Sequence, residues 1–311
     1  MKKQNYIIVG VDGGGTKTDA WAVGLDGRLL GKGRSGPSNL RNSGIKDSAL
    51  AVAEAIKKST SGLKRKKILS AFIGLAAIEE EYKGKENGIK KEILKYSKAL
   101  SDAGKVIIGS DQEAAFRSGT DEKEGVIVIA GTGCVARGWK KGKVIKSSGW
   151  GWLADEGSAC WAGQQLYQKV LREIDGREPK TTLYEIASRE IRFKNAEELN
   201  RKVYGVQPVA ALSRLSLAAD LAARMGDKEA GKIFEKAGEE LSLAALTVIK
   251  KLRFGKEFPL ILVGGMFKSS ILTETFKRKI KKNSPRAKII IPSDPPVYGA
   301  VKMAREKYGK S

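Results

Sequence analysis

Apolar runs of four to eight residues alternate with longer amphipathic stretches along the first part of the chain, and most runs end in glycine or aspartate. Short apolar runs bounded by turn residues predict strands, and longer stretches with helical spacing predict helices. The pattern gives three strands, a helix, a strand, a helix, a strand and a helix. The expected ranges are 6–12, 18–24, 28–34, 44–58, 68–75, 85–103, 105–109 and a helix beginning at Asp111.

The same order returns in the second part of the chain. Three more strands are expected, again joined by a glycine-rich turn and a short second turn, and a long helical region follows them. Each half therefore reads βββ-α-β-α-β-α, with a helical insertion in the second half. The expected ranges are 125–131, 134–140, 143–147, about 155–254 for the insertion, 260–263, a helix after Gly264-Gly265, 288–291 and 297–307.

This order predicts an α/β protein built from two duplicated domains that face a shared ligand cleft. Ligands of such folds bind beyond the carboxyl ends of the strands. We place the boundary in the polar link 119–125 and expect the last helix to pack back on the first domain. The predicted domains are 1–119 with 295–311, and 120–294 with the helical insertion.

The two glycine-rich turns are the strongest chemical signal. The first contains Gly14, Gly15, Thr16 and Lys17, and the second is Gly131-Thr132-Gly133. Glycine allows the backbone to approach a ligand closely, and clustered N–H groups form a concavity that binds anions. Two such turns in a duplicated unit predict two half-clamps on one polyphosphate. A nucleotide and phosphoryl transfer are therefore the leading hypothesis; an ordinary hairpin turn is the alternative for each.

Three polar residues lie where strands end. Asp12 precedes the first glycine turn and could hold a metal ion through water. Asp111 follows an apolar strand and could accept a proton from a substrate hydroxyl, or it could cap the helix that begins there. Asn39, in a loop after the third strand, suits a polyol ligand but is also a common turn residue.

Two further segments remain ambiguous. Asp155 is either the cap of the long helical region or a polar contact to the substrate, and the neighbouring Trp150 and Trp152 are expected to pack in the core. Gly264 and Gly265 end a strand, and their lack of side chains would let a flat ring such as adenine approach the backbone.

Composition narrows the chemistry. The chain has no histidine, which excludes a Ser-His-Asp triad and histidine-bound zinc, so a general base must be a carboxylate or a perturbed Lys, Cys or Tyr. Cys134 and Cys160 are the only cysteines and favour a reducing compartment, hence a cytoplasmic protein. No apolar run is long enough to span a membrane.

The net charge of +23 raises the question of nucleic acid. Basic runs occur at 64–67 and 277–282, but they lack interleaved aromatic residues. A lysine-rich solvated surface is the favoured interpretation, and nucleic-acid binding is not expected.

Taken in order, five segments resemble the sugar kinase, Hsp70 and actin superfamily, and more narrowly the BadF/BadG/BcrA/BcrD ATPase family with its N-acetylglucosamine kinases and archaeal ATP-dependent hexokinases. The resemblance covers essentially the whole chain and implies two ribonuclease H-like, actin-like domains. The segments are GVDGGGTKT, SGPSN, SDQEAAFRSG, VIAGTGC with GWGWLADEGSACW, and LVGGMFKSS.

The resemblance implies an ATP-dependent kinase that phosphorylates the C6 hydroxyl of N-acetylglucosamine or a related hexose. Asp111 would be the catalytic base and Asp12 would coordinate Mg²⁺ through water. Other roles follow by motif. Phosphate contacts would come from Gly14, Gly15, Thr16, Lys17, Thr132 and Gly133, adenosine contacts from Gly264, Gly265 and Lys268, and sugar contacts from Asn39, Asp111, Gly131 and Asp155.

Two departures and one alternative accompany the resemblance. Cys134 stands where the second turn usually has serine, and the segment before Asp155 is one residue short. The alternative is an ATPase that activates an acyl-CoA dehydratase or reductase through an iron–sulfur cluster bridging a dimer, for which two cysteines per chain would suffice. Dimers are common among similar kinases, so a homodimer is an open expectation; the sequence identifies neither an interface nor the sugar.

Overall fold

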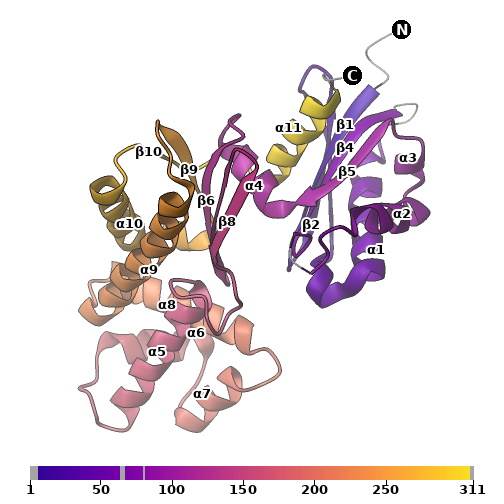
Figure 1. Cartoon of the computed structure of the whole chain (residues 1–311). Coiled ribbons are helices and arrows are strands. Elements are labelled where there is room, and N and C mark those ends of the chain that lie inside the picture. Colours follow the sequence, from indigo (N-terminus) through magenta and orange to yellow (C-terminus); the bar gives the residue numbers. More distant parts are fainter. Residues whose placement is uncertain (1–5, 64–66, 80, 309–311) are drawn as a thin grey trace. The chain divides into compact units, whose positions relative to one another are not determined.

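The structure, a computed structural model, describes residues 6–63, 67–79 and 81–308, with side chains to 306. The chain forms two compact units (Figure 1). One runs to Glu122 and resumes at Pro292, and the other spans Lys123–Ile291.

The first unit contains a mixed sheet in the order β3-β2-β1-β4-β5. The hairpin strands β2 and β3 run antiparallel, whereas β4 and β5 run parallel to β1. Its elements are β1 (Tyr6–Gly13), β2 (Thr18–Gly24), β3 (Leu29–Ser35), α1 (Leu40–Thr60), β4 (Lys67–Leu75), α2 (Glu86–Tyr96), α3 (Lys98–Ser101), β5 (Lys105–Ser110), α4 (Asp111–Gly119) and α11 (Pro296–Tyr308).

The second unit contains a sheet in the order β10-β9-β6-β7-β8. Five α-helices separate β8 from β9 in this part of the described chain. The elements are β6 (Gly125–Ala130), β7 (Cys134–Lys140), β8 (Lys143–Ser148), α5 (Ala159–Ile174), α6 (Thr182–Ile191), α7 (Ala196–Val203), α8 (Pro208–Arg224), α9 (Lys228–Leu252), β9 (Phe258–Val263), the 3₁₀ helix η2 (Gly265–Lys268), α10 (Ser270–Asn283) and β10 (Ala287–Ile290).

The two sheets have the same topology, so the duplication and the α/β class are confirmed. β6 corresponds to β1: each is the central strand, antiparallel to the hairpin on one side and parallel to the next strand on the other. The glycine turn that follows the central strand therefore lies at the same sheet edge as the carboxyl ends of its parallel neighbours.

The side-chain alternation of β1 builds a core on each face of the first sheet. Ile7, Val9 and Val11 face α1 and α2, whereas Ile8 faces α4 and α11. Figure 1 shows α11, from the far end of the chain, lying along this sheet. A Cβ on Gly10 would lie 2.4 Å from the backbone nitrogen of Val301, so α11 packs directly on the strand. The expected return of the last helix is thus observed.

Local differences from the sequence expectation have simple causes. α1 begins at Leu40 rather than near residue 44, because Asn39 caps a first turn there; Gly44, with a φ of 70°, then interrupts the helix with a kink. The helix expected over 85–103 is two helices that meet at Ser97. The basic run at 64–67 lies outside the described residues except for Lys67, which opens β4.

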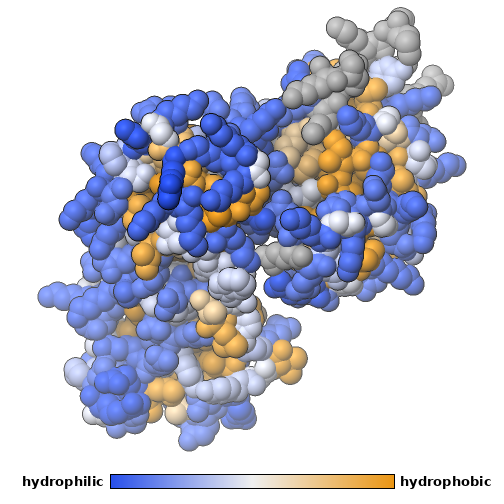
Figure 2. Space-filling model, in the orientation of Figure 1, coloured by the Kyte–Doolittle hydropathy of each residue, from blue (hydrophilic) through white to orange (hydrophobic). Residues whose placement is uncertain are grey.

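Polar and charged side chains cover most of the face in Figure 2, with apolar patches between them. Within the described residues, no helix combines the length and apolar character needed to cross a membrane.

We predict that Gly299→Ala destabilises the first unit. A Cβ at Gly299 would lie 1.8 Å from the carbonyl oxygen of Ala114 in α4, so the two helices must separate. Urea unfolding should show a loss of about 2 kcal/mol or more. The control is Gly88→Ala on α2, where a Cβ meets nothing within 4 Å; this change should raise stability by about 0.5–1 kcal/mol. Equal effects of the two changes would contradict the packing described here.

Candidate functional site

Backbone hydrogen bonds hold the first glycine turn in place, and the residues at its tip are accessible to solvent. The N–H of Gly14 donates to the carbonyl of Lys17 at 3.1 Å, which closes the turn. Ala76 and Ser38 donate their N–H groups to the carbonyls of Gly13 and Gly14, each at 3.0 Å. These bonds tie the turn to the segments after β4 and β3. Gly15, Thr16 and Lys17 remain exposed, so the predicted phosphate contacts lie at a preformed, open turn.

Lys17 is held in place by Asp19. Its Nζ lies 2.8 Å from Asp19 Oδ2, and Asp19 also accepts hydrogen bonds from Arg34 Nε at 2.6 Å and from a terminal nitrogen of Arg34 at 3.1 Å. Burial opposes the charge of Asp19, but the bonds from Arg34 and Lys17 outweigh it and leave its pKa lowered. Asp19 therefore stays ionised and keeps two cations at the edge of the turn.

Asp12 and Asp111 are close enough for their charges to interact. Asp12 is the penultimate residue of β1 and pairs with Gly74 of β4. A Cβ on Gly74 would be 3.1 Å from the Cα of Asp111, so the missing side chain lets the start of α4 approach the strand. Burial, followed by the charges of Asp111 and Asp19, raises the pKa of Asp12 to about 7, although Lys17 opposes the shift. The first unit thus brings two carboxylates together beside the first glycine turn.

Asp111 is not the N-cap of α4. Ser110 occupies that position, and its side chain accepts from the N–H of Gln112 at 3.2 Å. Asp111 is the first helical residue, and its Oδ1 accepts from the same N–H at 2.8 Å. This bond orients the carboxylate at the carboxyl end of β5.

Asn39 caps a helix through its side-chain oxygen, and its expected contact with a sugar stays a prediction. It is the N-cap of α1, with Oδ1 accepting from the N–H of Arg41 at 3.0 Å. Its amide nitrogen lies 3.7 Å from where a Cβ of Gly15 would be. The oxygen is used by the helix, and the nitrogen faces the tip of the first turn, where it can serve as a donor.

The carbonyl groups of the second glycine turn accept hydrogen bonds that hold the turn in place. Gly131 N–H donates to Gly133 at 2.9 Å, and the first N–H groups of α5, from Ala159 and Cys160, donate to Gly131 and Thr132 at 2.8 and 3.2 Å. The carbonyls of the turn are thereby occupied by the helix. N–H groups are the part of such a turn that binds anions, and Thr132 lies at its exposed tip.

Asp155 is buried and hydrogen-bonds this turn, while its expected sugar contact stays a prediction. Only 4 % of the residue is exposed. Oδ2 accepts from the N–H of Cys134 at 3.2 Å, and Oδ1 accepts from the N–H groups of Gly149 and Trp150 at 2.9 and 2.8 Å. Asp155 is not the helix cap, because Ser158 caps α5. Its carboxylate therefore joins the second glycine turn to the residues that follow β8.

The cysteines are buried, with 4 % of Cys134 and none of Cys160 exposed. The thiol of Cys134 donates to the carbonyl of Glu156 at 3.1 Å. Burial raises the pKa of its thiol to about 12, and burial also raises the pKa of Cys160. Neither thiol is placed at a surface where two chains could share a cluster, so the activator alternative loses the feature that suggested it.

Gly264 joins the end of β9 to the second glycine turn. Its φ is 119°, and a Cβ there would lie 2.1 Å from the carbonyl oxygen of Ala130, the residue just before the turn. Gly265 has open space around it, and Lys268 is exposed at the end of η2. The predicted adenosine residues therefore share one end of the second sheet with Gly131-Thr132-Gly133.

Two exposed apolar residues next to Asp155 were not foreseen as site residues. Trp150 and Leu153 are each 74 % exposed, whereas Trp152 packs against the core as expected. The ammonium group of Lys146 lies 4.6 Å from the centre of the Trp150 ring. The glycines flanking Trp150 were the available signal, since a tryptophan in a glycine-rich loop has few neighbours to bury it.

The predicted residues thus form two groups. Asp12, Lys17, Asn39 and Asp111 lie together in the first unit, and the Gly131–Gly133 turn, Asp155 and Gly264 lie together in the second.

A family model described as the BadF/BadG/BcrA/BcrD ATPase family matches residues 9–302. The chain belongs to this family. The resemblance carried by the five segments is therefore confirmed.

Two relatives are named as sugar kinases. The N-acetyl-D-glucosamine kinase of Dictyostelium discoideum is 31 % identical over 96 % of this family member and 97 % of its own length. The N-acetylmuramic acid/N-acetylglucosamine kinase of Clostridium acetobutylicum is 29 % identical over 96 % and 98 %. A solved structure from Chromobacterium violaceum, there only proposed to be an N-acetylglucosamine kinase, has a TM-score of 0.75 at 22 % identity over 96 % and 98 %. That likeness confirms the predicted actin-like fold.

We predict that Asp155→Asn lowers stability and weakens ATP binding. The amide nitrogen would face N–H donors, so the free energy of unfolding should fall by about 2 kcal/mol and the KM for ATP should rise. Chemical unfolding and steady-state kinetics test this, with Glu156→Gln as the exposed neighbouring control. An increase confined to the KM for the sugar, at unchanged stability, would instead identify Asp155 as a sugar ligand.

A second prediction follows from the raised pKa of Asp12. Because the folded protein disfavours its charge, stability is lost as pH rises from about 4 toward 7. Asp12→Asn should therefore stabilise the chain by about 2 kcal/mol at pH 8 and have little effect at pH 4. Urea unfolding at both pH values, with a chelator present, measures the difference. A pH-independent effect would show that Asp12 is not unfavourably charged.

Proposed function

We propose that the chain transfers the γ-phosphoryl group of ATP to the C6 hydroxyl of N-acetylglucosamine or a related hexose. Membership of an ATPase family implies use of ATP, and two full-length relatives at about 30 % identity are named as kinases of N-acetylglucosamine or N-acetylmuramic acid. The observation that carries the proposal is the carboxylate of Asp111, held at the carboxyl end of β5 and interacting with Asp12 beside the first phosphate turn.

The two turns supply the phosphate contacts in this proposal. Lys17 would bind phosphate oxygens through its ammonium group, and the turns would do so through N–H groups and the hydroxyls of Thr16 and Thr132. Phosphoryl transfer depends mainly on positioning and on stabilising the charge that builds on the transferred group. Turns tied down by backbone hydrogen bonds meet that need, because they do not have to reorganise.

The residues fit a magnesium ion held by one protein carboxylate. Within the described residues, no group of three or more metal-ligating side chains exists, so phosphates and water must supply most ligands, as is usual for Mg²⁺. Asp12 would hold the ion: its charge is disfavoured by burial and by Asp111, and a nearby cation would relieve that repulsion. When bound, Mg²⁺ would neutralise charge on the phosphates.

Asp111 would act as the general base. The hydroxyl proton of the sugar moves to the Asp111 carboxylate as the hydroxyl oxygen attacks the γ-phosphorus. The bond to the β–γ bridging oxygen breaks, and ADP leaves with that electron pair. Asn39 would orient the sugar through its amide nitrogen, and Gly131 would contribute from the second turn. Trp150 is an additional candidate for stacking on the sugar.

The proposal leaves the sugar open between a dedicated N-acetylglucosamine kinase and a broader hexokinase. We place the reaction in the cytoplasm, where ATP is available, and retain the homodimer as a proposal.

We predict that Asp111→Asn abolishes most sugar-dependent ADP release. Loss of general-base assistance should lower kcat by about 10²–10⁴ with little change in the KM for ATP. A coupled assay with ATP and magnesium across glucose, mannose, glucosamine and N-acetylglucosamine tests this and identifies the substrate. Asp47→Asn removes an exposed carboxylate on α1 and should leave kcat unchanged. ADP release that ignores every sugar would overturn the kinase proposal for this panel.

A further inference from the structure

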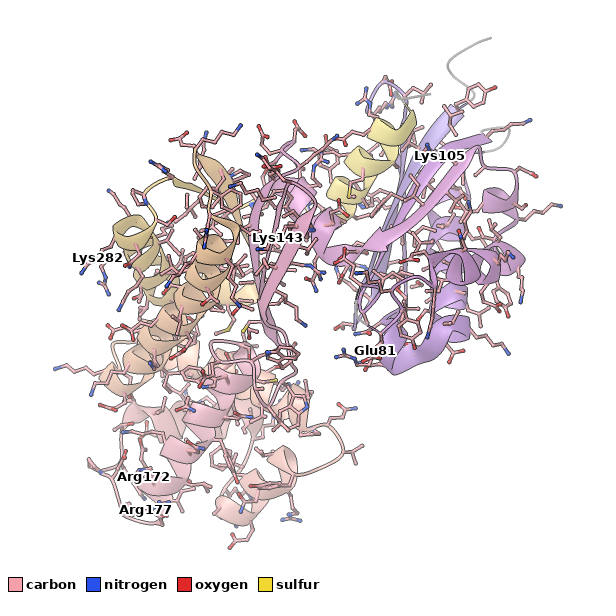
Figure 3. The ribbon with its side chains drawn as sticks, in the orientation of Figure 1. Glu81, Lys105, Lys143, Arg172, Arg177 and Lys282 are labelled. Atoms are coloured by element: carbon pink, nitrogen blue, oxygen red, sulfur yellow. The ribbon has the colours of Figure 1, made fainter. Side chains whose placement is uncertain are left out.

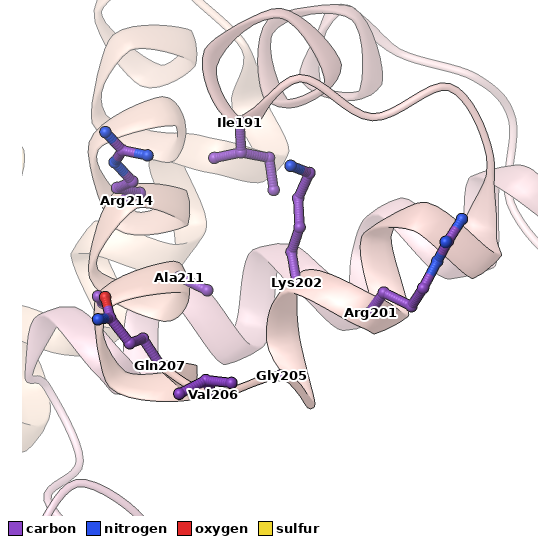
Figure 4. A pocket seen from close by; sticks show the side chains of 9 residues that line it. Ile191, Arg201, Lys202, Gly205, Val206, Gln207, Ala211 and Arg214 are labelled. Atoms are coloured by element: carbon purple, nitrogen blue, oxygen red, sulfur yellow. The ribbon is translucent and has the colours of Figure 1, made fainter.

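The helical insertion contains a cavity outside the site described above. Its volume is about 630 Å³. It lies between α7 and α8, with the connecting loop below and the end of α6 above (Figure 4). The lining residues are Ile191, Arg201, Lys202, Gly205, Val206, Gln207, Ala210, Ala211 and Arg214.

The lining combines cationic and apolar residues. Figure 4 shows Lys202 reaching from α7 toward Ile191, with Arg214 across from it on α8 and Arg201 on the outer side of α7. No acidic residue lines the cavity. Ile191, Ala210 and Ala211 supply apolar wall. Three cations and a hydrophobic wall together suit an anion that carries an organic group.

The three cations around this cavity lack carboxylate partners, whereas several other cations of the second unit have them. At the end of α5, Arg172 binds Glu178 at 2.5 Å and Arg177 binds Asp175 at 2.6 Å (Figure 3). On α10, Lys277 pairs with Glu274 at 2.8 Å. Among the described residues, Arg201, Lys202 and Arg214 form no ion pair with an acidic side chain. Their mutual repulsion is therefore not offset by the protein itself.

The chemistry of these side chains selects the class of anion. The arginine guanidinium presents a planar fork that matches phosphate oxygens, and a lysine ammonium adds a point charge. A phosphate monoester is close to doubly charged at neutral pH, which these three cations can neutralise. The cavity is larger than one phosphate group needs, so it has room for the organic part against Ile191.

We propose that this cavity binds a phosphate-bearing small molecule, a phosphate monoester or a nucleotide, at a site separate from the two phosphate turns. Lys202 and Arg214 hold the phosphate, Arg201 adds charge at the rim, and the apolar wall holds the ester group. The site is independent of the proposed kinase reaction.

The test uses the δ1-methyl NMR signal of Ile191 in the full chain, because this side chain lines the cavity and reports binding there rather than at the phosphate turns. Ile191→Val assigns the signal. Inorganic phosphate, glucose 6-phosphate and ADP are titrated separately against sodium chloride of equal ionic strength. We expect saturable shifts with the phosphate compounds and tighter binding of at least one ester than of inorganic phosphate.

Two charge-matched double variants decide the assignment. Lys202→Gln with Arg214→Gln should weaken binding about tenfold or more, since charge-assisted hydrogen bonds are lost. Arg278→Gln with Lys281→Gln removes the same charge from the basic face of α10 and should change affinity less than about twofold. All four side chains are exposed, so both variants should fold. Absence of saturation, equal losses in the two variants, or inorganic phosphate binding as tightly as both esters would overturn the proposal.

Discussion

The candidate site in each unit depends on one parallel strand pairing, β1 with β4 in the first sheet and β6 with β9 in the second. β1 and β6 are central strands, antiparallel to the hairpin on one side and parallel to the next strand on the other. The turn into the hairpin and the ends of the parallel strands must therefore emerge at the same edge. In the first unit this edge gathers Asp12, the first glycine turn and Asp111. Reversing either parallel strand would carry its terminal residue to the opposite edge.

This arrangement brings three carboxylates close together at one edge of the first sheet. Asp12 lies among Asp111 and Asp19, and burial together with these neighbours raises its pKa to about 7. The pKa of Asp19 is lowered instead, because Arg34 and Lys17 bind its carboxylate directly. Direct ion pairs thus neutralise Asp19, whereas the charge of Asp12 remains disfavoured; in the proposed reaction a bound Mg²⁺ would relieve it. Unfavourable local choices of this kind are expected at functional sites.

The sequence predicts the features that depend on the spacing of apolar residues and glycines. It does not predict the features that depend on where individual side chains point in the folded chain. The repeated strand order and the glycine turns are visible in the sequence and predict the fold class correctly; the roles of the site residues stay predictions. The clamp by Asp155 depends on a bond to Cys134 across 21 residues, which no local pattern encodes. The exposure of Trp150 was missed because tryptophan is usually buried. The cationic cavity was missed because it depends on how α6, α7 and α8 pack together.

The effect of the large positive charge depends on where the unpaired cations lie in the structure. A total of +23 states how many cations exceed anions, and it says nothing of where the excess lies. Some of the lysine and arginine side chains in the second unit pair with carboxylates, as Lys279 does with Glu239 at 2.7 Å. Exposed pairs of this kind add little stability, but they cancel the local field. The cations around Ile191 have no such partners among the described residues, so the field there persists over a concave surface, and a concave cationic surface favours an anionic ligand.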